Sequence, residues 1–320
     1  MRVDATSAIS TLAMVIVVGR VPPCSAQAGV LPVPEVHSVS YGPHGHDNVL
    51  DLFQAKSPKP TPLVIYIHGG GFAAGSKSWL PLPLLNALLH RGISVATINY
   101  RLTDSAPFPA AMIDGARAIQ FLRSRALEWN LDPKRFGAMG GSAGAGMSLW
   151  IGFHDDMADP RNPDPVLRQS TRLQVVAATN GQSSYDPRWI LHHIGVRVVE
   201  HPFFKPFYGL ADSELDSPKA YRLYDAASPM TYLSPDDPPV FLYYDVVPRA
   251  PLAPDADPNL AMHHIIFGNL LKVRMDSLHI DCVVRHLDDY TSAGRTPETA
   301  TQALVDFLAS HLGLARNAVH

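Results

Sequence analysis

Cysteine is nearly missing from this chain, which has two among 320 residues, Cys24 and Cys282. If Cys24 leaves with the N-terminal segment, only Cys282 remains, and no disulfide can form within the rest of the chain. An excess of charge of one sign is missing as well, since 26 Lys and Arg stand against 29 Asp and Glu. Nothing in this balance favours nucleic acid or an anionic membrane as a partner.

Long apolar runs are also missing, because the stretch over residues 9–18 is too short to span a bilayer comfortably. It is followed by Ala26-Gln27-Ala28, a cleavage site of small residues that is typical of an export signal. We predict a signal peptide over residues 1–28 and a secreted or periplasmic bacterial protein. Because Asp4 offsets Arg2 at the start of the segment, an uncleaved anchor stays open as the alternative.

The remaining residues, 29–320, carry no internal repeat and show an alternation of strand-like and helix-like stretches. Such alternation predicts an α/β domain with a mostly parallel sheet covered by helices on both faces. The expected strands are residues 36–40, 49–54, 63–67, 93–99, 136–139, 173–179, 240–244 and 279–284, the first two as an antiparallel pair. The expected helices are residues 80–89, 110–129, 143–153, 263–277 and 297–312.

One segment, about residues 186–235, interrupts this alternation. It is rich in aromatic residues and histidines without clean periodicity, among them Trp189, His201 and Phe203. We expect it to form a small cap over a site at the carboxyl ends of the strands, where aromatic side chains suit an acyl or aryl pocket.

The run Gly140-Gly141-Ser142-Ala143-Gly144 lies between an expected strand and an expected helix. A serine on such a sharp turn needs small neighbours, because the strained backbone brings adjacent side-chain positions close together. Ser142 is therefore the candidate nucleophile.

A second motif, His68-Gly69-Gly70-Gly71-Phe72, directly follows the apolar stretch 63–67. Its glycines leave backbone N–H groups free to face a site. In acyl transfer, each fixed donor stabilises the developing oxyanion by roughly 3 kcal/mol. Gly70, Gly71 and the N–H of Ala143 are the candidate donors, and we expect His68 to brace the loop rather than to move a proton.

With these motifs the sequence resembles the α/β-hydrolase superfamily, in the esterase branch similar to hormone-sensitive lipase and to secreted feruloyl and acetylxylan esterase-like hydrolases. Further matching residues stand in order between and around the two motifs: Asn99-Tyr100-Arg101-Leu102, Phe108-Pro109-Ala110, Asp114 and Leu131-Asp132-Pro133. The resemblance covers most of residues 36–315. It implies an eight-stranded α/β-hydrolase fold and a catalytic Ser-His-Asp triad.

In the chain order of that superfamily, the histidine follows the last strand, which indicates His286. His279, His263 and His264 are the alternatives. The acid should follow the strand at residues 240–244, where the loop is long and rich in proline. Our first choice is Asp255, then Asp257, then Asp245, whereas Asp288 and Asp289 are expected to be solvated or to cap a helix.

The resemblance implies a serine carboxylic ester hydrolase acting on small acyl or aryl esters, including acetyl or feruloyl groups linked to polysaccharide. Its mechanism requires no metal or organic cofactor. Two alternatives stay open. One is an amidase, peptidase or lactonase with the same triad, and the other is a non-catalytic binding protein on the same fold.

Overall fold

The computed structural model describes residues 32–246, 251–291 and 297–315. Contacts divide the chain into Met1–Pro32 and Val33–His320, and all elements below belong to the second unit. The predicted export segment, residues 1–28, lies outside the described residues. In the described ranges, no helix combines the length and apolar character that crossing a membrane requires.

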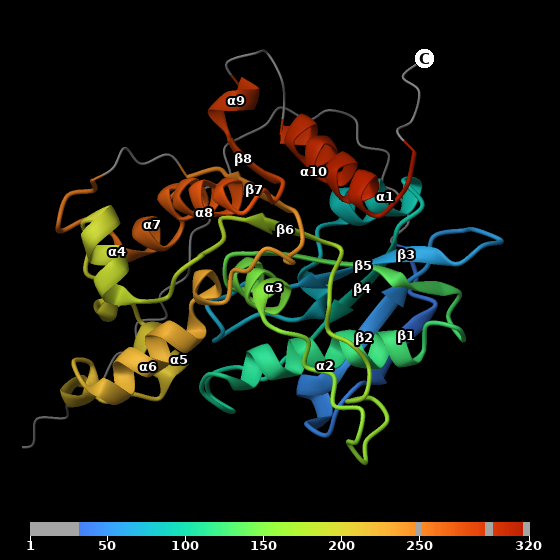
Figure 1. Cartoon of the computed structure of the whole chain (residues 1–320), viewed down its shortest axis with the longest axis horizontal. Helices are drawn as coiled ribbons and strands as arrows, with labels where there is room; N and C mark the ends of the chain where they lie inside the picture. Colours follow the sequence, from blue (N-terminus) through green and yellow to red (C-terminus); the bar gives the residue numbers. More distant parts are fainter. Residues whose placement is uncertain (1–31, 247–250, 292–296, 316–320) are drawn as a thin grey trace, which may run out of the picture. The chain divides into compact units, whose positions relative to one another are not determined.

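One sheet in the order β1-β2-β4-β3-β5-β6-β7-β8 forms the centre of the second unit (Figure 1). The strands are β1 (Val36–Ser40), β2 (Val49–Phe53), β3 (Thr61–Ile67), β4 (Ser94–Ile98), β5 (Leu131–Gly141), β6 (Val175–Thr179), β7 (Val240–Tyr244) and β8 (Cys282–His286). The first two strands and the β2–β4 pair are antiparallel, and every later pair is parallel. All residues of β3 are buried, as a strand covered on both faces requires.

Helices cover both faces of this sheet. On one face, α1 (Leu82–His90) contacts β4, and α10 (Pro297–His311) contacts β6 and β7, and their leucines belong to one apolar cluster. The other face carries α2 (Ala110–Ser124), α3 (Ala143–Phe153) and α8 (Ile266–Ser277) in a larger apolar cluster. Because the sheet is enclosed in this way, its polar chemistry is confined to the strand ends.

The segment between β6 and β7 holds the helices expected of a cap. These are α4 (Pro187–Ile194), α5 (Phe204–Tyr208) and α6 (Pro218–Ala227), with the short 3₁₀ turns η3 (Val198–Glu200), η4 (Asp212–Glu214) and η5 (Pro229–Thr231). Two further short helices are α7 (Pro258–Met262) and α9 (Asp288–Thr291), and two more 3₁₀ turns are η1 (Gly45–Asn48) and η2 (Lys77–Trp79).

Two expected helices differ from the structure by three or more residues at one end. Helix α2 ends at Ser124 rather than at residue 129. The helix expected over residues 263–277 begins only at Ile266, after a separate short helix α7 that ends at Met262. His263 therefore lies in the turn between two helices, which changes what its side chain can reach.

Candidate active site

Ser142 occupies the sharp turn between β5 and α3, as the sequence predicted. Its backbone has φ 52° and ψ −119°, which a residue with a side chain rarely adopts. Its N–H donates to the carbonyl of Thr179 on the neighbouring strand at 2.9 Å. A Cβ added to Gly140 or Gly144 would lie 2.4 Å or 2.0 Å from the carbonyl oxygen of Ile67. The glycines are thus required by the close approach of β3.

His263 is the histidine that contacts the serine. The distance between Ser142 Oγ and His263 Nε2 is 2.8 Å, within hydrogen-bonding range. A hydrogen bond with the backbone of Asn259 on α7 favours the protonated ring and so raises its pKa. Burial lowers the pKa of His263 below its ordinary value of 6.5, so the ring is neutral at neutral pH and Nε2 can accept the serine proton.

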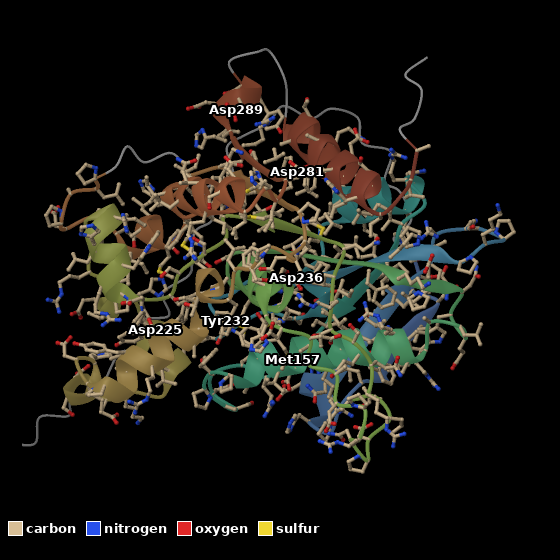
Figure 2. All side chains as sticks on the ribbon, in the orientation of Figure 1. Met157, Asp225, Tyr232, Asp236, Asp281 and Asp289 are labelled. Carbon is tan, nitrogen blue, oxygen red and sulfur yellow. The ribbon has the colours of Figure 1, made fainter. Side chains whose placement is uncertain are left out.

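His286, our first choice from the sequence, is not brought to Ser142. It is the last residue of β8, which lies three strands from β5 in the sheet, roughly 14 Å at the usual strand spacing. Its Nδ1 accepts from the N–H of Asp288 at 3.1 Å, and its own N–H donates to Asp289. Figure 2 shows Asp289 on α9, far from Asp225 on the cap helix α6. Because His286 belongs to β8 itself, its ring stays at the position of that strand in the sheet.

The other two histidines considered also lie elsewhere. His264 is buried, and its Nδ1 accepts from the N–H of Ile266 at the start of α8. His279 adopts φ 59° in the turn before β8. The signal that could have indicated His263 is the helix start Asp257-Pro258, which places a separate helix, α7, directly before this histidine.

The three candidate carboxylates differ in their relation to His263. Asp245 follows β7, and its Oδ1 accepts from the side-chain amide of Asn180 at 2.7 Å. Its charge is the larger of two carboxylate influences that raise the pKa of His263, and Asp257 is the smaller. Asp257 caps α7 by accepting from the N–H of Asn259 at 2.9 Å. Asp255 is exposed and forms no side-chain hydrogen bond or ion pair within the described ranges, so the structure favours Asp245 over our first choice.

The candidate oxyanion donors lie on the loop after β3 and at the start of α3. Gly70 and Gly71 have φ 103° and 61°, values suited to glycine. The carbonyl of Gly70 closes a tight turn with the N–H groups of Ala73 and Ala74. Among the residues that the structure describes, the N–H groups of Gly70 and Gly71 have no acceptor. Ala143 is the first residue of α3, so its N–H has no acceptor within the helix.

His68 braces this loop, as expected. It is buried, its Nδ1 bonds to the carbonyl of Gly69 at 2.8 Å, and its ring stacks on Tyr100 at 4.2 Å. The hydroxyl of Tyr100 donates to the carbonyl of His68 at 2.8 Å. Burial lowers the pKa of His68 to about 4, so the ring stays neutral and serves as a fixed structural part.

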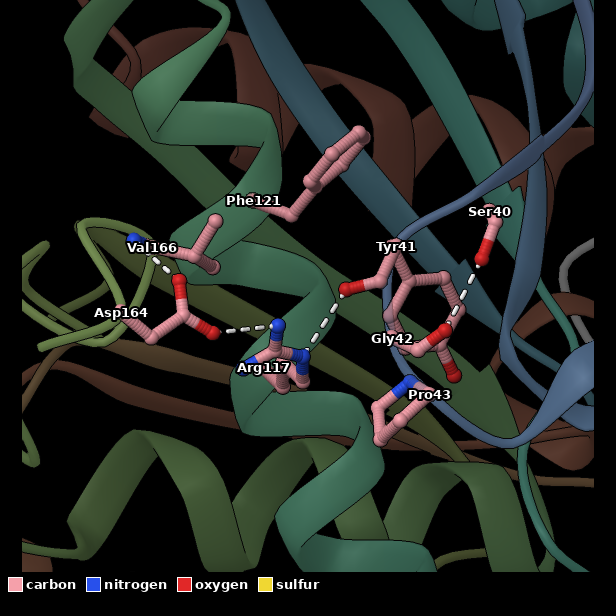
Figure 3. Close-up of a pocket in the computed structure, with 8 residues that line it drawn as sticks. All are labelled: Ser40, Tyr41, Gly42, Pro43, Arg117, Phe121, Asp164 and Val166. Carbon is pink, nitrogen blue, oxygen red and sulfur yellow. Dashed lines mark hydrogen bonds and ion pairs between the residues drawn. The ribbon is translucent and has the colours of Figure 1, made fainter.

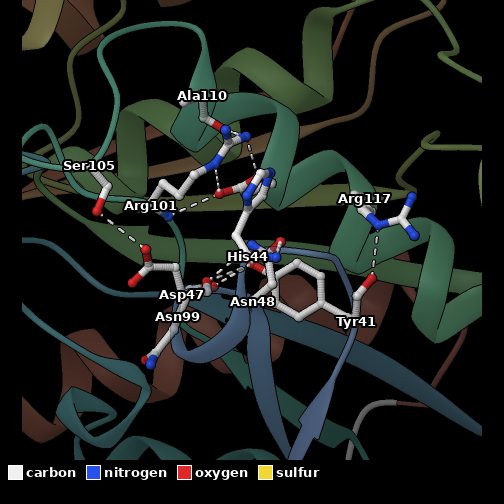
Figure 4. A network of polar contacts seen from close by, with 10 residues as sticks. Tyr41, His44, Asp47, Asn48, Asn99, Arg101, Ser105, Ala110 and Arg117 are labelled. Carbon is white, nitrogen blue, oxygen red and sulfur yellow. Dashed lines mark hydrogen bonds and ion pairs between the residues drawn. The ribbon is translucent and has the colours of Figure 1, made fainter.

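The residues around Tyr100 anchor the end of β4 (Figure 4). The guanidinium of Arg101 binds Asp114 on α2 in a bidentate ion pair, with contacts of 2.8 and 2.7 Å. The hydroxyl of Tyr41 donates to the carbonyl of Asn99 at 2.5 Å. The stretch Asn99-Tyr100-Arg101, which matched the superfamily in the sequence, thus supports the loop that carries Gly70.

A separate hollow of about 460 Å³ lies between the turn after β1 and helix α2 (Figure 3). It is lined by Ser40, Tyr41, Gly42, Pro43, Arg117, Phe121, Asp164 and Val166. Its two charged groups satisfy each other, because Arg117 and Asp164 are 2.6 Å apart and Arg117 also donates to the carbonyl of Tyr41. It contains none of the candidate catalytic residues. No cluster of metal ligands occurs in the described ranges either.

Residues 50–245 match the family model described as BD-FAE. This stretch is more than half of the chain and includes the glycine loop, Ser142 and Asp245. The chain belongs to the BD-FAE family. His263 lies beyond the matched stretch, so family membership alone does not assign it.

Two curated relatives of this BD-FAE member come from Mycobacterium tuberculosis. Esterase LipQ is 26% identical over 225 residues, covering 69% of this chain and 50% of LipQ. The probable carboxylic ester hydrolase LipM is 29% identical over 211 residues, covering 64% of this chain and 46% of LipM. This chain therefore spans about half the length of both relatives.

Two solved structures share the fold. The acetyl ester-xyloside bifunctional hydrolase from Caldicellulosiruptor lactoaceticus gives a TM-score of 0.65 at 22% identity, covering 83% of this chain and 89% of that one. A truncated carbohydrate esterase from gut microbiota gives 0.67 at 18% identity, covering 86% and 95%. Together with the sheet order, these likenesses confirm the predicted α/β-hydrolase fold.

Proposed function

We propose that this chain is a serine ester hydrolase in which Ser142 is the nucleophile and His263 the general base. The observation that carries the proposal is the 2.8 Å contact between Ser142 Oγ and His263 Nε2 on the strained turn after β5. A serine hydroxyl is a weak nucleophile and needs such a base. The loop with unpaired N–H groups at Gly70 and Gly71 supplies the second requirement, stabilisation of an oxyanion.

The mechanism follows from these positions. His263 takes the Oγ proton of Ser142 as Oγ attacks the ester carbonyl, and the carbonyl π electrons move onto oxygen, held by the N–H groups of Gly70, Gly71 and Ala143. When the intermediate collapses, the bond to the alcohol oxygen breaks and His263 gives its proton to that oxygen. Water then attacks the acyl-enzyme by the same route and releases the carboxylic acid.

Asp245 is proposed as the acid of the triad. It follows β7, where the Asn180 amide fixes its carboxylate, and its charge favours the protonated form of His263. That charge stabilises the imidazolium that forms when Ser142 attacks. The Asp245 carboxylate bonds with Asn180, so Asp245 acts on the ring of His263 chiefly through its charge.

The proposed substrates are esters of small acyl groups, including acetyl groups carried by carbohydrate. The support is the nature of the similar proteins, an acetyl ester-xyloside hydrolase and a carbohydrate esterase. The curated relatives support the coarser class, since both are named for ester hydrolysis. Export of the protein to reach such a substrate is a proposal that rests on the predicted signal peptide, residues 1–28.

The test is hydrolysis of p-nitrophenyl esters, from acetate to octanoate, by the wild-type protein and by Ser142→Ala and His263→Ala. Each substitution should lower kcat by about four to six orders of magnitude, as losses of a triad nucleophile or base do. Circular dichroism and thermal unfolding of each variant show whether the fold is intact. Turnover retained by folded Ser142→Ala would overturn the proposal.

His286→Ala and Asp255→Asn are the matched controls, because they change the same residue types at positions that the structure does not connect to Ser142. Both should keep most of the wild-type kcat, whereas Asp245→Asn should lower it by about one to two orders of magnitude, because it removes a charge that stabilises the imidazolium. If folded His286→Ala is inactive and His263→Ala is active, the general base is His286, the histidine that chain order indicated.

A further inference from the structure

Phe203 is the aromatic residue of the cap segment that both reaches solvent and touches the catalytic loop. Its side chain is 37% exposed, whereas Phe204, Phe207 and Tyr208 from the following helix α5 are buried in the core. A Cβ added to Gly71 would lie 2.3 Å from Cδ2 of Phe203. The ring therefore packs directly on the backbone that carries a candidate oxyanion donor.

His201 connects Phe203 to the element that carries the base. Its Nδ1 accepts from the backbone N–H of Phe203 at 3.4 Å, and the two ring centroids are 5.2 Å apart. Its side chain also hydrogen-bonds with the side chain of Asn259 on α7, the helix that ends just before His263. Burial lowers the pKa of His201, which keeps the ring neutral and Nδ1 free to accept.

The chemistry of the reaction indicates which part of the ester lies near Phe203 and His201. The alcohol oxygen must face His263 Nε2, because that nitrogen protonates it when the intermediate collapses. The alcohol portion of an ester thus lies on the His263 side of Ser142, and the acyl portion lies on the other side. A chain of contacts therefore runs from Gly71 through Phe203 and His201 to α7, the helix that ends beside His263.

We infer that Phe203 is a specificity residue for the alcohol portion of the ester, that its exposed ring packs against a ring-shaped alcohol, and that His201 is a positioning residue for it. The alcohol classes that suit such a surface are phenols and sugars, which offer a flat or ring-shaped face to an aromatic side chain. The inference rests on the proposed function and adds which part of the substrate the cap recognises.

Two substrate series separate the alcohol side from the acyl side. In the first, the acyl group is always acetyl and the alcohol changes from methanol to phenol and 2-naphthol. In the second, the alcohol is always p-nitrophenol and the acyl group lengthens from acetyl to octanoyl. The kcat/KM of each variant is divided by the wild-type value for the same ester, so that differences in leaving-group reactivity cancel.

For Phe203→Ala, this ratio should fall about tenfold from the methyl to the naphthyl ester, the size of one lost aromatic contact. It should stay level along the acyl series. Leu127→Ala, which removes a fully exposed apolar side chain outside the cap, is the control and should leave both series level. A ratio for Phe203→Ala that changes along the acyl series, or along neither series, overturns the inference.

His201→Ala should reproduce part of the effect of Phe203→Ala on the alcohol series. His201→Asn should restore the wild-type pattern, because an Asn side-chain oxygen can accept from the N–H two residues on. If His201 had a merely structural role, the kcat/KM ratios of His201→Ala and His201→Asn would fall equally for all esters. Failure of the proposed function is a different result: wild-type protein would then show no Ser142-dependent turnover on any ester, whereas failure of the inference leaves that turnover intact.

Discussion

The charges around His263 act on its pKa in opposite directions. Burial is the strongest influence and lowers the pKa, and His201 lowers it further. Asp245 and, less strongly, Asp257 raise it. Because the base must be neutral to accept the serine proton, the pKa of His263 sets the acidic limb of the activity profile.

We expect kcat/KM to rise with pH through a pKa below 6.5 and then to level off. Asp245→Asn removes a charge that favours the protonated ring, so the limb should move to lower pH and the plateau should fall. Asp257→Asn should move it in the same direction by less. The measurement is the pH dependence of kcat/KM for p-nitrophenyl acetate, and a limb that moves with Asp257→Asn but not with Asp245→Asn would assign the acid to Asp257.

Ser142 and the glycines at 70 and 71 could be predicted because each belongs to a short local motif whose backbone requirements are visible in the residues. The partner of Ser142 could not, since it lies 121 positions away. The choice of His286 followed the chain order of the superfamily, but in this chain the ring belongs to β8 itself and stays at that edge of the sheet. Among the residues that the structure describes, the turn between α7 and α8 is what brings a histidine, His263, to Ser142.

At the scale of elements, the turn from β5 to α3 holds Ser142 in a backbone conformation that costs free energy. A side-chain-bearing residue at φ 52° and ψ −119° is strained by about 1–3 kcal/mol. The turn persists because its neighbours fix it, through the bond from Ser142 N–H to Thr179 and the close packing of Gly140 and Gly144 against β3.

Ser142→Gly should therefore be more stable than Ser142→Ala. Glycine relieves the strain but loses about 0.5–1 kcal/mol of backbone entropy on folding, which leaves a net gain of about 1 kcal/mol. Urea unfolding of the two inactive variants measures this difference directly. Equal midpoints at equal slopes would show that the turn is not strained in the folded protein.

Element boundaries were harder to predict where burial continues past the end of a helix. Helix α2 stops at Ser124, yet Ala126 and Trp129 are still buried, so the apolar pattern continued through a turn that closes with Leu131 N–H donating to Ala126. The split between α7 and α8 has the same origin, because apolar residues on both sides of His263 are buried. The spacing of apolar residues indicates which residues are buried. It does not indicate where the backbone hydrogen bonds of a helix end.

At the scale of the whole molecule, the strands could be predicted because a parallel sheet covered on both faces needs continuous apolar runs, such as β3 and β7. The order of the strands depends on long-range pairing and was not predicted from the sequence. In that order β5, β6 and β7 are neighbours. The residues that follow them, Ser142, Asn180 and Asp245, therefore lie together at the carboxyl ends of the strands.

Asp237 links the stability of the whole molecule to pH. It lies in the turn before β7, next to Asp236 (Figure 2), and its side chain is fully buried. The N–H of Ser234 donates to it at 2.7 Å, but its nearest cation, Arg172, is 3.6 Å away. Burial raises the pKa of Asp237 from 3.8 to about 6, so the folded protein binds this proton more tightly than the unfolded chain does.

A carboxyl with a raised pKa lowers the free energy of unfolding as pH rises from about 4 to about 6, and the penalty is complete above that range. Asp237→Asn keeps an acceptor for Ser234 and removes the charge. It should be more stable than the wild type at neutral pH by on the order of 1–2 kcal/mol, and this advantage should shrink as pH falls toward 4.

Asp236→Asn is the matched control, because this neighbouring carboxylate contacts the same arginine at 2.7 Å but is exposed. Its hydrogen bond with Ser234 and the charge of Arg172 lower its pKa, so its contribution is present above the unfolded pKa and is lost as pH falls through the folded value. The two variants should thus differ from the wild type with opposite slopes in urea unfolding measured across this pH range. A stability difference for Asp237→Asn that does not change with pH would mean that its carboxyl titrates alike in the folded and unfolded states, since only a difference in bound protons can produce such a slope.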